Sequence, residues 1–546
     1  MTLLGAYERS DNAELPTCST LGLPPIAGNS VKFQQVEPLT AGVVGAGIAG
    51  LSAAIALRRA GFEVEVYERS RFGNEIGAAI SAPPNATVVL MRWGFDFAAA
   101  NIVPNCSTRY AAAGDLGVVF ENNYDDVDKV LMGTSSLSFH RVDLHRGLRA
   151  LATGDAEIEG DDEEGDSEES DRDDEEWHRT GKGRRRGRHI GTPVVIRLGC
   201  GITSVDCENG VLTLADGSQV QKDLVIIADG AHSSLLADFL GHPPATQPTG
   251  RSIYRWLVSM DEVMADPELA EQFRSKPPGF LGWFDAEKRV HWVNYTCRGG
   301  SVLNNAVVHD SEEHPLSSSQ SNDNSGDQAD YDSIQSGRAN DGRDSEEEGN
   351  ILWHAPAAKE TVLETLSNFH PAVRRIVSMA SEDGIRVHRL YKRPPLESFV
   401  RGRTAVIGDA AHVMMPTHAA GCSVAIESAS VIEVLFRGLK GYPNSSATGY
   451  GRENVIAERL QLFDKLRIPR CNLTMLASNA GPDWLRVPGV EQEIRRFYRG
   501  ALPPKDALPW SDEFRLVLFY YDGYEVAKQA LKDEKERRNG GIHGQQ

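Results

Sequence analysis

The chain has 546 residues, which is enough for two or three domains with a large apolar core. Its formal net charge is −20, but segment 155–188 holds 15 acidic and 7 basic residues and segment 310–348 holds 12 and 2, so the two together carry −18. The remainder is nearly neutral, so charge does not identify the partner of an active site, and we expect no nucleic-acid partner.

Both acidic segments are poor in aromatic and β-branched residues and rich in Asp, Glu, Ser, Gly and Asn. Such segments cannot bury enough apolar surface to offset the entropy of the chain, so we predict disordered insertions at 153–190 and 309–350. The first joins an acidic block to the basic run KGRRRGR, and these two could attract one another or bind a charged partner. A solvated insertion is the interpretation that we favour.

The seven cysteines are scattered and contain no Cys-x-x-Cys pair, which indicates neither a disulfide framework nor a zinc site, and we expect no metal. Residues 1–36 lack a basic start followed by an apolar run, so they do not resemble a secretory signal. We therefore expect a cytoplasmic protein in a reducing compartment.

The stretch from Leu39 to Glu68 has the pattern of a strand, a glycine turn, a helix and a second strand. Gly45, Gly47 and Gly50 give the spacing Gly-x-Gly-x-x-Gly, which suits a tight turn, close approach to a pyrophosphate and close packing of helix on strand. The helix that follows would direct its unpaired N–H groups at a diphosphate, and Glu68 could accept a hydrogen bond from a ribose hydroxyl. This pattern predicts a dinucleotide but does not separate FAD from NAD.

The same stretch begins with 19 uncharged residues, so hydropathy alone would also admit a membrane span. The glycine spacing, the carboxylate at the end of the next strand and the continuation through Arg58 and Arg59 fit a βαβ unit better. We therefore expect no membrane span.

Further along, a loop runs through Pro83 and Pro84 into a predicted helix at 86–93, with Asn85 able to cap it. Residues 138–152 have mostly helical spacing, with Arg141 at the start. After the first insertion, strands separated by Asn-Gly and Asp-Gly turns lead to a buried strand that ends at Asp229.

Alternating stretches from 249 to about 308 predict an antiparallel second sheet, and residues 357–381 are helical in pattern. A short apolar strand at 404–407 then precedes Asp409, and an amphipathic helix is predicted from Gly421 onward. This again places a carboxylate at a strand end and a helix N-terminus near a loop. The tail is helical in pattern at 455–476 and 488–499.

Three stretches in this order and spacing resemble the single-component flavoprotein aromatic hydroxylases, most closely their salicylate hydroxylase-like branch. They are the glycine turn with Glu68, the Asp229-Gly230 pair followed by Ser233, and the run Gly408 to His412 followed by Pro416 and Gly421. The pieces EIGAAI, PPNA, HRVDLH and YTCRGGSVLN support the resemblance. It covers residues 39–499, less the two insertions.

The resemblance implies an α/β fold, with a Rossmann-like FAD-binding domain built on a mixed sheet of the glutathione reductase type. An antiparallel-sheet substrate domain would be inserted in it, and a helical region would follow. The predicted division is an N-terminal extension at 1–38, the first part of the FAD-binding domain at 39–240, the substrate domain at 241–390, the second part of the FAD-binding domain at 391–440, and a C-terminal helical region and tail at 441–546.

In that family the first motif holds the FAD pyrophosphate and adenosine ribose, and a carboxylate matching Asp409 binds the ribityl or pyrophosphate region. Arg141 matches an arginine near the flavin, and the helix from Gly421 would direct its dipole at the pyrimidine end of the ring. The cofactor-binding residues implied are Gly45, Gly47, Gly50, Glu68, Ala79, Arg141, Asp229, Asp409, Pro416, Gly421 and Cys422.

The chain has no second Gly-x-Gly-x-x-Gly, so the hypothesis is that NAD(P)H binds transiently, reduces FAD and leaves. Molecular oxygen would then form a C4a-hydroperoxyflavin that hydroxylates an aromatic, phenolic small molecule. The candidate catalytic residues are Tyr254, Arg255 and His412, with His418 beside them. Tyr254 could instead be core packing, and His412 could serve only to order its loop.

The chain departs from the family pattern at several positions near the flavin loop, among them Ala420, Ser423 and Ser428, and Tyr295-Thr296 stands for the usual Tyr-Pro. Two alternatives therefore stay open. One is an epoxidase or oxidative tailoring enzyme of a non-aromatic metabolite. The other is an FAD-binding protein without turnover that acts through its acidic loops. The second and third motifs disfavour an NAD-dependent dehydrogenase.

Overall fold

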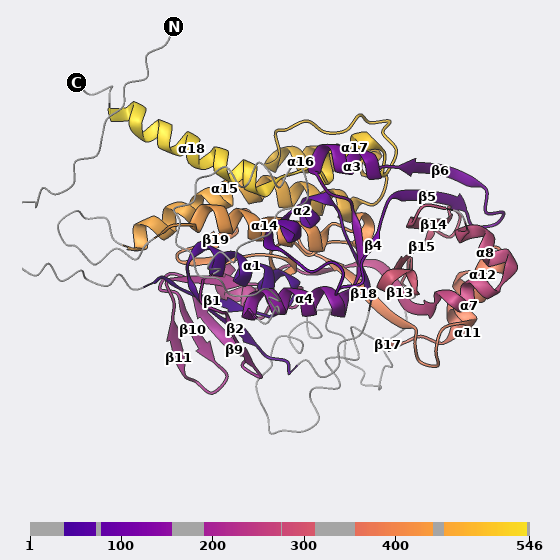
Figure 1. The fold of residues 1–546 in the computed structure, drawn as a ribbon, viewed down its shortest axis with the longest axis horizontal. Coiled ribbons are helices and arrows are strands. Elements are labelled where there is room, and N and C mark those ends of the chain that lie inside the picture. Colours follow the sequence, from indigo (N-terminus) through magenta and orange to yellow (C-terminus); the bar gives the residue numbers. More distant parts are fainter. Residues whose placement is uncertain are drawn as a thin grey trace, which may run out of the picture.

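The computed structural model describes residues 38–71, 78–154, 191–274, 276–311, 355–439 and 452–542. Both predicted acidic insertions fall almost entirely outside these residues, as does the predicted N-terminal extension apart from its last residue. Helix α4 (Arg141–Thr153) ends where the first insertion was placed, and strand β16 (Val302–Asp310) extends into the start of the second. Two large sheets lie side by side in the described chain (Figure 1).

The first sheet has six strands and carries the dinucleotide-binding pattern. Its strands pair in parallel except β19, which is antiparallel to β20, so the predicted mixed sheet is confirmed. The central strands are almost entirely buried. One face of the sheet packs against strand β10 (Val211–Leu214), where a Cβ at Gly42 would lie 3.0 Å from Cδ1 of Leu212. Across the sheet the order is β19 (Val400–Arg401), β20 (Thr404–Val406), β12 (Leu224–Ile227), β1 (Thr40–Val44), β2 (Glu63–Glu68) and β8 (Val195–Leu198).

The second sheet has eight strands and is antiparallel except where β14 runs parallel to β5. Two of its strands, β5 and β6, come from before residue 240, so this sheet draws on chain that the sequence had placed in the first part of the FAD-binding domain. Its order is β17 (Ala355–Pro356), β18 (Arg386–Lys392), β13 (Gln247–Ser259), β16, β15 (Val290–Cys297), β14 (Gly279–Asp285), β5 (Ser107–Ala112) and β6 (Val118–Asn123).

The two faces of this eight-stranded sheet are different. On the helix-covered face, Tyr254, Trp283, Trp292 and Val307 form one row across the strands and pack against α11 (Lys359–Thr365) and α12 (Pro371–Ser378). The adjacent rows point the other way and define the cofactor-side face. This face carries Arg255, Val293, Tyr110, Phe280 and Tyr295.

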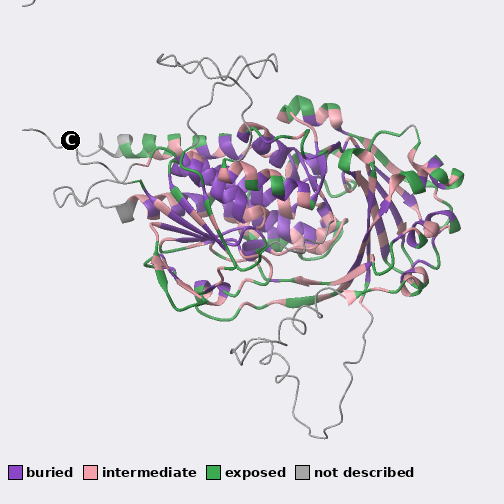
Figure 2. Cartoon of the chain, turned by 60° about the horizontal axis from the view of Figure 1, so that its bottom comes forward, coloured by how far each residue is buried: buried purple, intermediate pink, exposed green. Residues whose placement is uncertain are grey.

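The C-terminal helices cover the cofactor-side face of the second sheet, and two of them also pack against α14 (Gly421–Phe436). They are α15 (Arg452–Ala480), α16 (Val490–Phe497), α17 (Asp512–Leu518) and α18 (Gly523–Ile542). Side chains of the first three pack with Phe280, Tyr110 and Tyr295 in one apolar cluster. Figure 2 shows the buried residues concentrated in the central helices and in the strands of the large sheets.

Two local predictions need correction. Helix α14 (Gly421–Phe436) is buried almost all round instead of being amphipathic, because it lies among α1 (Ile48–Ala60), α2 (Pro84–Trp93), α15 and α18. Helix α2 begins at Pro84 after Pro83, so Asn85 is inside the helix and does not cap it. Its amide donates instead to the carboxylate of Glu427 on α14, at 2.8 Å.

None of the helices in the described part of the chain is long and apolar enough to cross a membrane. The same residues contain no group of His, Cys, Asp and Glu side chains arranged to hold a metal ion.

Candidate active site

At two of its three glycines, the turn between β1 and α1 leaves no room for a side chain. Gly45 has φ of +96°, and a Cβ there would lie 2.5 Å from the carbonyl oxygen of Ala228. A Cβ at Gly50 would lie 1.9 Å from the carbonyl oxygen of Gly45. A Cβ at Gly47 would meet no heavy atom of the described chain within 4 Å, its chain neighbours aside. Two glycines therefore serve protein packing, whereas Gly47 borders open space.

The first turn of α1 is free to bind an anion. Gly47 is the N-cap residue, no side chain caps the helix, and its first turn holds no acidic residue. Glu68, at the end of β2, accepts the N–H of Ala46 at 2.8 Å and that of Ser70 at 2.7 Å. Each carboxylate oxygen retains a second lone pair, so Glu68 can still accept a hydroxyl.

The two other motifs lie at the same edge of the sheet as the glycine turn. Parallel strands β12 and β20 are neighbours, so Asp229 and Asp409 follow them side by side. A Cβ at Gly408, where φ is +62°, would lie 2.6 Å from Cβ of Ala49 in α1. The three motifs that are separate in the sequence are therefore in contact.

Between these carboxylates lies Arg393, which the sequence analysis missed. It is 7% exposed, and its Nη2 donates to the backbone oxygen of Asp409 at 2.5 Å. Burial lowers the pKa of Arg393, while the carboxylates of Asp409 and Asp229 oppose that change. One oxygen of Asp229 is buried with no hydrogen-bond partner among the described residues, and burial raises the pKa of this carboxyl. No sequence motif pointed to Arg393, because it follows directly after β18 and reaches this place from the other sheet.

The loop after Asp409 contains two buried histidines. His412 is 1% exposed and lies edge-on to Phe399, and neither ring nitrogen has a hydrogen-bond partner in the described chain. His418 is fully buried, with Nδ1 3.2 Å from Oγ of Ser478 and its ring 4.9 Å from that of Phe514. Burial lowers the pKa of His412 to about 4 and that of His418 to about 3, so both are neutral at pH 7.

Facing this loop is a basic and phenolic cluster on the cofactor-side face. Arg255 on β13 lies near Tyr295 on β15 and near Arg141 at the start of α4, and burial is the main cause that lowers its pKa. Among the described residues, no carboxylate pairs with Arg255, and its Nε has no hydrogen-bond partner. The hydroxyl of Tyr295 donates to the backbone oxygen of Ala79 at 2.9 Å.

Cys422 connects this cluster to the helix N-terminus. It stands in the first turn of α14, half-buried, and burial raises the pKa of its thiol to about 12. The carboxylate of Asp409 adds to that increase and Arg141 opposes it, so these three residues are close together. Gly421 begins the same helix, and a Cβ there would be 3.8 Å from Oδ1 of Asp409. Pro416 begins the short 3₁₀ turn before it.

Tyr254 is not brought to this site. It lies on the helix-covered face, 4% exposed, with its ring stacked on that of His309 at 4.1 Å. The side chains of consecutive strand residues point to opposite faces, so Arg255 and Tyr254 cannot both face the cofactor loop. The tyrosine that lies beside Arg255 is Tyr295. The alternation of side chains along the strands of the predicted second sheet could have indicated that these two residues share a face.

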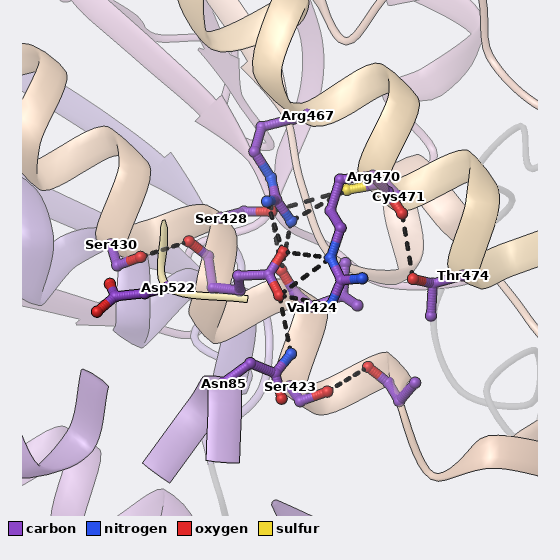
Figure 3. Close-up of polar contacts among 12 residues, drawn as sticks. Asn85, Ser423, Val424, Ser428, Ser430, Arg467, Arg470, Cys471, Thr474 and Asp522 are labelled. Atoms are coloured by element: carbon purple, nitrogen blue, oxygen red, sulfur yellow. Dashed lines mark hydrogen bonds and ion pairs between the residues drawn. The ribbon is translucent and has the colours of Figure 1, made fainter. Parts of the chain in front are cut away.

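A buried charged network holds α14 in place (Figure 3). Glu427 is fully buried and accepts from Arg470 at 3.0 Å and from Asn85, and it pairs with Arg467 at 2.5 Å. Arg467 also donates to Oγ of Ser428, and Arg470 donates to the backbone oxygens of Val517 and Leu518. The two arginines keep the pKa of Glu427 below its usual range despite burial. Ser428 is one of the departures from the family pattern, and here it accepts a hydrogen bond from an arginine.

The fold and the site together define a dinucleotide-binding flavoprotein. The open space at Gly47, the uncapped start of α1 and the unpartnered oxygen of Asp229 fit a cofactor with a diphosphate and polyol groups. A flavin ring placed beyond them would meet Arg141, Cys422 and the N-terminus of α14. The residues present therefore fit FAD.

Comparisons with known proteins agree with this class. Residues 43–90 match the NAD(P)-binding Rossmann-like domain family. The FAD-dependent monooxygenase cfoG of Aspergillus candidus is 28% identical over 90% of this chain and 94% of its own, and hispidin-3-hydroxylase of Neonothopanus nambi is 27% identical over 80% and 86%. The fold is similar to that of a salicylate hydroxylase in a substrate complex, with a TM-score of 0.59, 21% identity and coverage of 90% of this chain and 98% of the other.

A second solved structure, CtdE in complex with FAD and a substrate, has a TM-score of 0.61 and 18% identity, with coverage of 91% of this chain and 98% of the other. The chain is an FAD-dependent monooxygenase, and its sequence and fold are similar to those of the FAD-dependent aromatic hydroxylases. The cofactor and the α/β fold expected from the sequence are thereby confirmed.

Proposed function

We propose that this enzyme uses NAD(P)H and O₂ to hydroxylate an aromatic small molecule that carries a phenol, and that Arg255 binds the anionic group of that substrate. FAD, when bound, supplies the redox chemistry with NAD(P)H and with oxygen. The remaining steps are the work of the chain's own residues: binding, orientation, exclusion of water and control of a proton.

The single observation that carries this proposal is the state of Arg255. Arg255 is half-buried, and its Nε is shielded from solvent. A guanidinium that is partly withdrawn from water normally has an acidic partner, because an uncompensated charge in such a place is costly. Arg255 has none in the described chain, and its neighbour Arg141 is also cationic. An anionic substrate group placed against Arg255 would supply the missing partner and form a charge-assisted hydrogen bond.

A guanidinium in this position also affects reactivity. A nearby positive charge lowers the pKa of a phenol, so the substrate hydroxyl would be held as phenolate. A phenolate makes the ring more electron-rich, which favours attack by electrophilic oxygen. Tyr295 lies beside Arg255 and can orient the same group, while the buried apolar residues around it exclude water.

For the cofactor, we propose the following assignments. Gly45, Gly47 and Gly50 with the start of α1 hold the diphosphate, and Glu68 holds the adenosine ribose. The middle of the FAD molecule, between its diphosphate and its ring, is bordered by Asp229, Asp409 and Ala79. The flavin ring is bordered by Arg141, Pro416, Gly421 and Cys422. At this place the dipole of the 16-residue helix α14 favours negative charge. His412, neutral and buried, orders the loop between Asp409 and Pro416.

The test is NAD(P)H consumption by the purified flavoprotein with a panel of phenols, hydroxybenzoates and polyprenylated compounds. We expect consumption that rises only with a phenol, together with a product heavier by one oxygen atom. Arg255→Met should raise KM for that phenol at least tenfold, because the anion loses its partner. Arg251→Met is the matched control, since Arg251 stands on the same strand but pairs with Asp310 at 2.8 Å.

Bound FAD with no stimulation by any compound of the panel would contradict the proposal and favour a flavoprotein without turnover. Stimulation by a non-aromatic alkene alone would favour an epoxidase. Equal KM values for the Arg255→Met and Arg251→Met variants would contradict the role given to Arg255.

A further inference from the structure

We propose that Arg393 is a positioning residue for FAD. From the end of the second sheet, its positive charge allows the diphosphate of the cofactor to lie beside the carboxylates of Asp229 and Asp409. This inference rests on the cofactor assignments of the proposed function but not on its phenolic substrate. It concerns a residue that no sequence motif connected with the site.

The residues assigned to the diphosphate and to the middle of FAD have an unfavourable charge. Asp229 and Asp409 are acidic, Glu68 stands at the adenosine end, and Ala79 and the three glycines carry no charge. A diphosphate brings further negative charge, and like charges repel more strongly where they are partly withdrawn from water. The N-terminus of α1 offsets part of this repulsion. A cation close to both carboxylates would offset the rest.

Both carboxylates follow turns that touch the start of α1. A Cβ at Gly45 would lie 3.0 Å from Cα of Asp229, and one at Gly408 would lie 2.6 Å from Cβ of Ala49 in the first turn of α1. Asp409 comes directly after Gly408 in the sequence. The place that we assign to the diphosphate therefore borders both acidic residues.

Arg393 brings a cation to this place. It is 7% exposed, and its Nη2 donates to the backbone oxygen of Asp409 at 2.5 Å. The carboxylates of Asp409 and Asp229 both raise the pKa of Arg393 against the effect of burial, so both lie close enough to act on its charge. A guanidinium stays protonated in proteins, so the positive charge is present at any working pH.

The neighbouring groups do not provide this charge. His412 lies near Asp409 but is neutral at pH 7, because burial lowers its pKa to about 4. Arg467 is already paired with the buried carboxylate of Glu427. Arg141 lies near the first turn of α14, at the end of the site where we place the flavin ring. The guanidinium at the end of β18 is therefore the cation that can act on the diphosphate.

The backbone around Arg393 is held on both sides. Before it, Lys392 ends β18, which pairs with β13. After it, Pro394 restricts Arg393 to an extended backbone. The backbone oxygen of Leu396 then accepts from the amide of Asn472 on α15 at 3.0 Å. The charge is therefore in place before FAD binds, so little ordering cost opposes its effect.

The experiment measures the dissociation constant of FAD, from the fluorescence of the flavin that each holoenzyme releases on dilution. Arg393→Lys keeps the charge, Arg393→Gln keeps a hydrogen-bond donor for Asp409, and Arg393→Met keeps only apolar volume. We expect the glutamine and methionine variants to bind FAD at least tenfold more weakly than the wild type, because both lack the charge. The lysine variant should stay within threefold of the wild type.

Arg389→Met is the matched control, because Arg389 is exposed on the same strand and its replacement removes the same charge from the chain. It should change the dissociation constant less than twofold. Wild-type affinity in Arg393→Gln overturns this inference, since the hydrogen bond to Asp409 would then be sufficient. Equal weakening in Arg393→Lys and Arg393→Met also overturns it, since packing would then explain the loss.

Circular dichroism shows whether each variant is folded, and the lysine and glutamine variants carry the comparison if the methionine variant is not. NAD(P)H consumption by the wild type separates this inference from the proposed function. If the Arg393 series behaves as expected but no phenol stimulates the wild type, the proposed function fails and this inference stands. If a phenol stimulates the wild type but all Arg393 variants bind FAD equally well, this inference fails and the proposed function stands.

Discussion

The glycine turn and the cofactor-side face of the large sheet are two binding surfaces of the same molecule, but they are specified in different ways. At the turn, recognition depends on backbone: Gly45, Gly47 and Gly50 lie within six residues, and no side chain caps the helix. On the sheet, recognition depends on side chains from separate strands, such as Arg255 and Tyr295. The first kind of site is local in the sequence, whereas the second depends on strand register.

The largest expected effect distinguishes two glycines of the turn. Gly50→Ala should destabilise the protein by more than about 4 kcal/mol, because its Cβ would lie 1.9 Å from a backbone oxygen. Gly47→Ala should keep the stability of the FAD-free protein within about 1 kcal/mol and weaken FAD binding at least tenfold. Urea unfolding and FAD titration test both. Unchanged FAD affinity in Gly47→Ala would show that the diphosphate does not approach Gly47.

A second prediction concerns the buried network that anchors α14. Glu427→Gln leaves two buried guanidinium groups without their carboxylate, so we expect a loss of about 3–5 kcal/mol in the free energy of unfolding. The control is Glu493→Gln, which breaks an exposed pair with Arg496 and should cost about 0–1 kcal/mol. Similar losses in urea unfolding for the two variants would contradict a structural role for Glu427.

Acid stability gives a third prediction, from His412 and His418. Their folded pKa values, about 4 and about 3, lie below the usual value of about 6.5. As the pH falls from about 6.5 to 4, the unfolded chain binds protons that the folded chain does not. Stability should therefore fall by roughly 1.4 kcal/mol per pH unit for each histidine.

The variant His418→Gln should lose one of these two contributions while keeping a side chain that can hydrogen-bond Ser478. Urea unfolding at several pH values between 7 and 4.5 measures the slope. A variant slope equal to that of the wild type would show that His418 is protonated in the folded protein.

The smallest expected effect tests which tyrosine belongs to the site. Tyr295→Phe removes one hydrogen bond, to Ala79, worth about 1 kcal/mol, and should raise KM for the phenolic substrate by a few-fold. Tyr254→Phe should leave kcat and KM unchanged, because Tyr254 lies on the helix-covered face. A larger kinetic effect at Tyr254 than at Tyr295 would reverse this assignment of the faces.

The difference between these two sites also explains which parts of the fold and of the site could be predicted from the sequence. The strand, turn and helix around Gly45 and the strand ends at Asp229 and Asp409 were predictable, because each is marked by glycine spacing or a carboxylate after an apolar run. The residues that were missed, such as Arg393 and Arg470, are single side chains with no local pattern. Tertiary packing brings Arg393 to the site from the end of β18 and Arg470 from α15.

Helix α14 shows the same limit from another direction. Its apolar spacing predicted one buried face, but neighbouring helices cover it almost completely. Which helices would surround it could not be read from its own residues, because α1 and α18 are separated by most of the chain. The same is true of Asn85, which was predicted to cap a helix. Its amide donates instead to the buried carboxylate of Glu427, more than three hundred residues away in the sequence.

The most direct test of the central claim is turnover of the stimulating phenol under isotopically labelled O₂ with FAD and NAD(P)H. Mass spectrometry of the product would then show the origin of the new oxygen atom. We expect one labelled oxygen atom in each product molecule, bound to the aromatic ring, with none incorporated from labelled water. A product without label, or NAD(P)H consumption that yields only hydrogen peroxide with every phenol, would contradict hydroxylation by this enzyme.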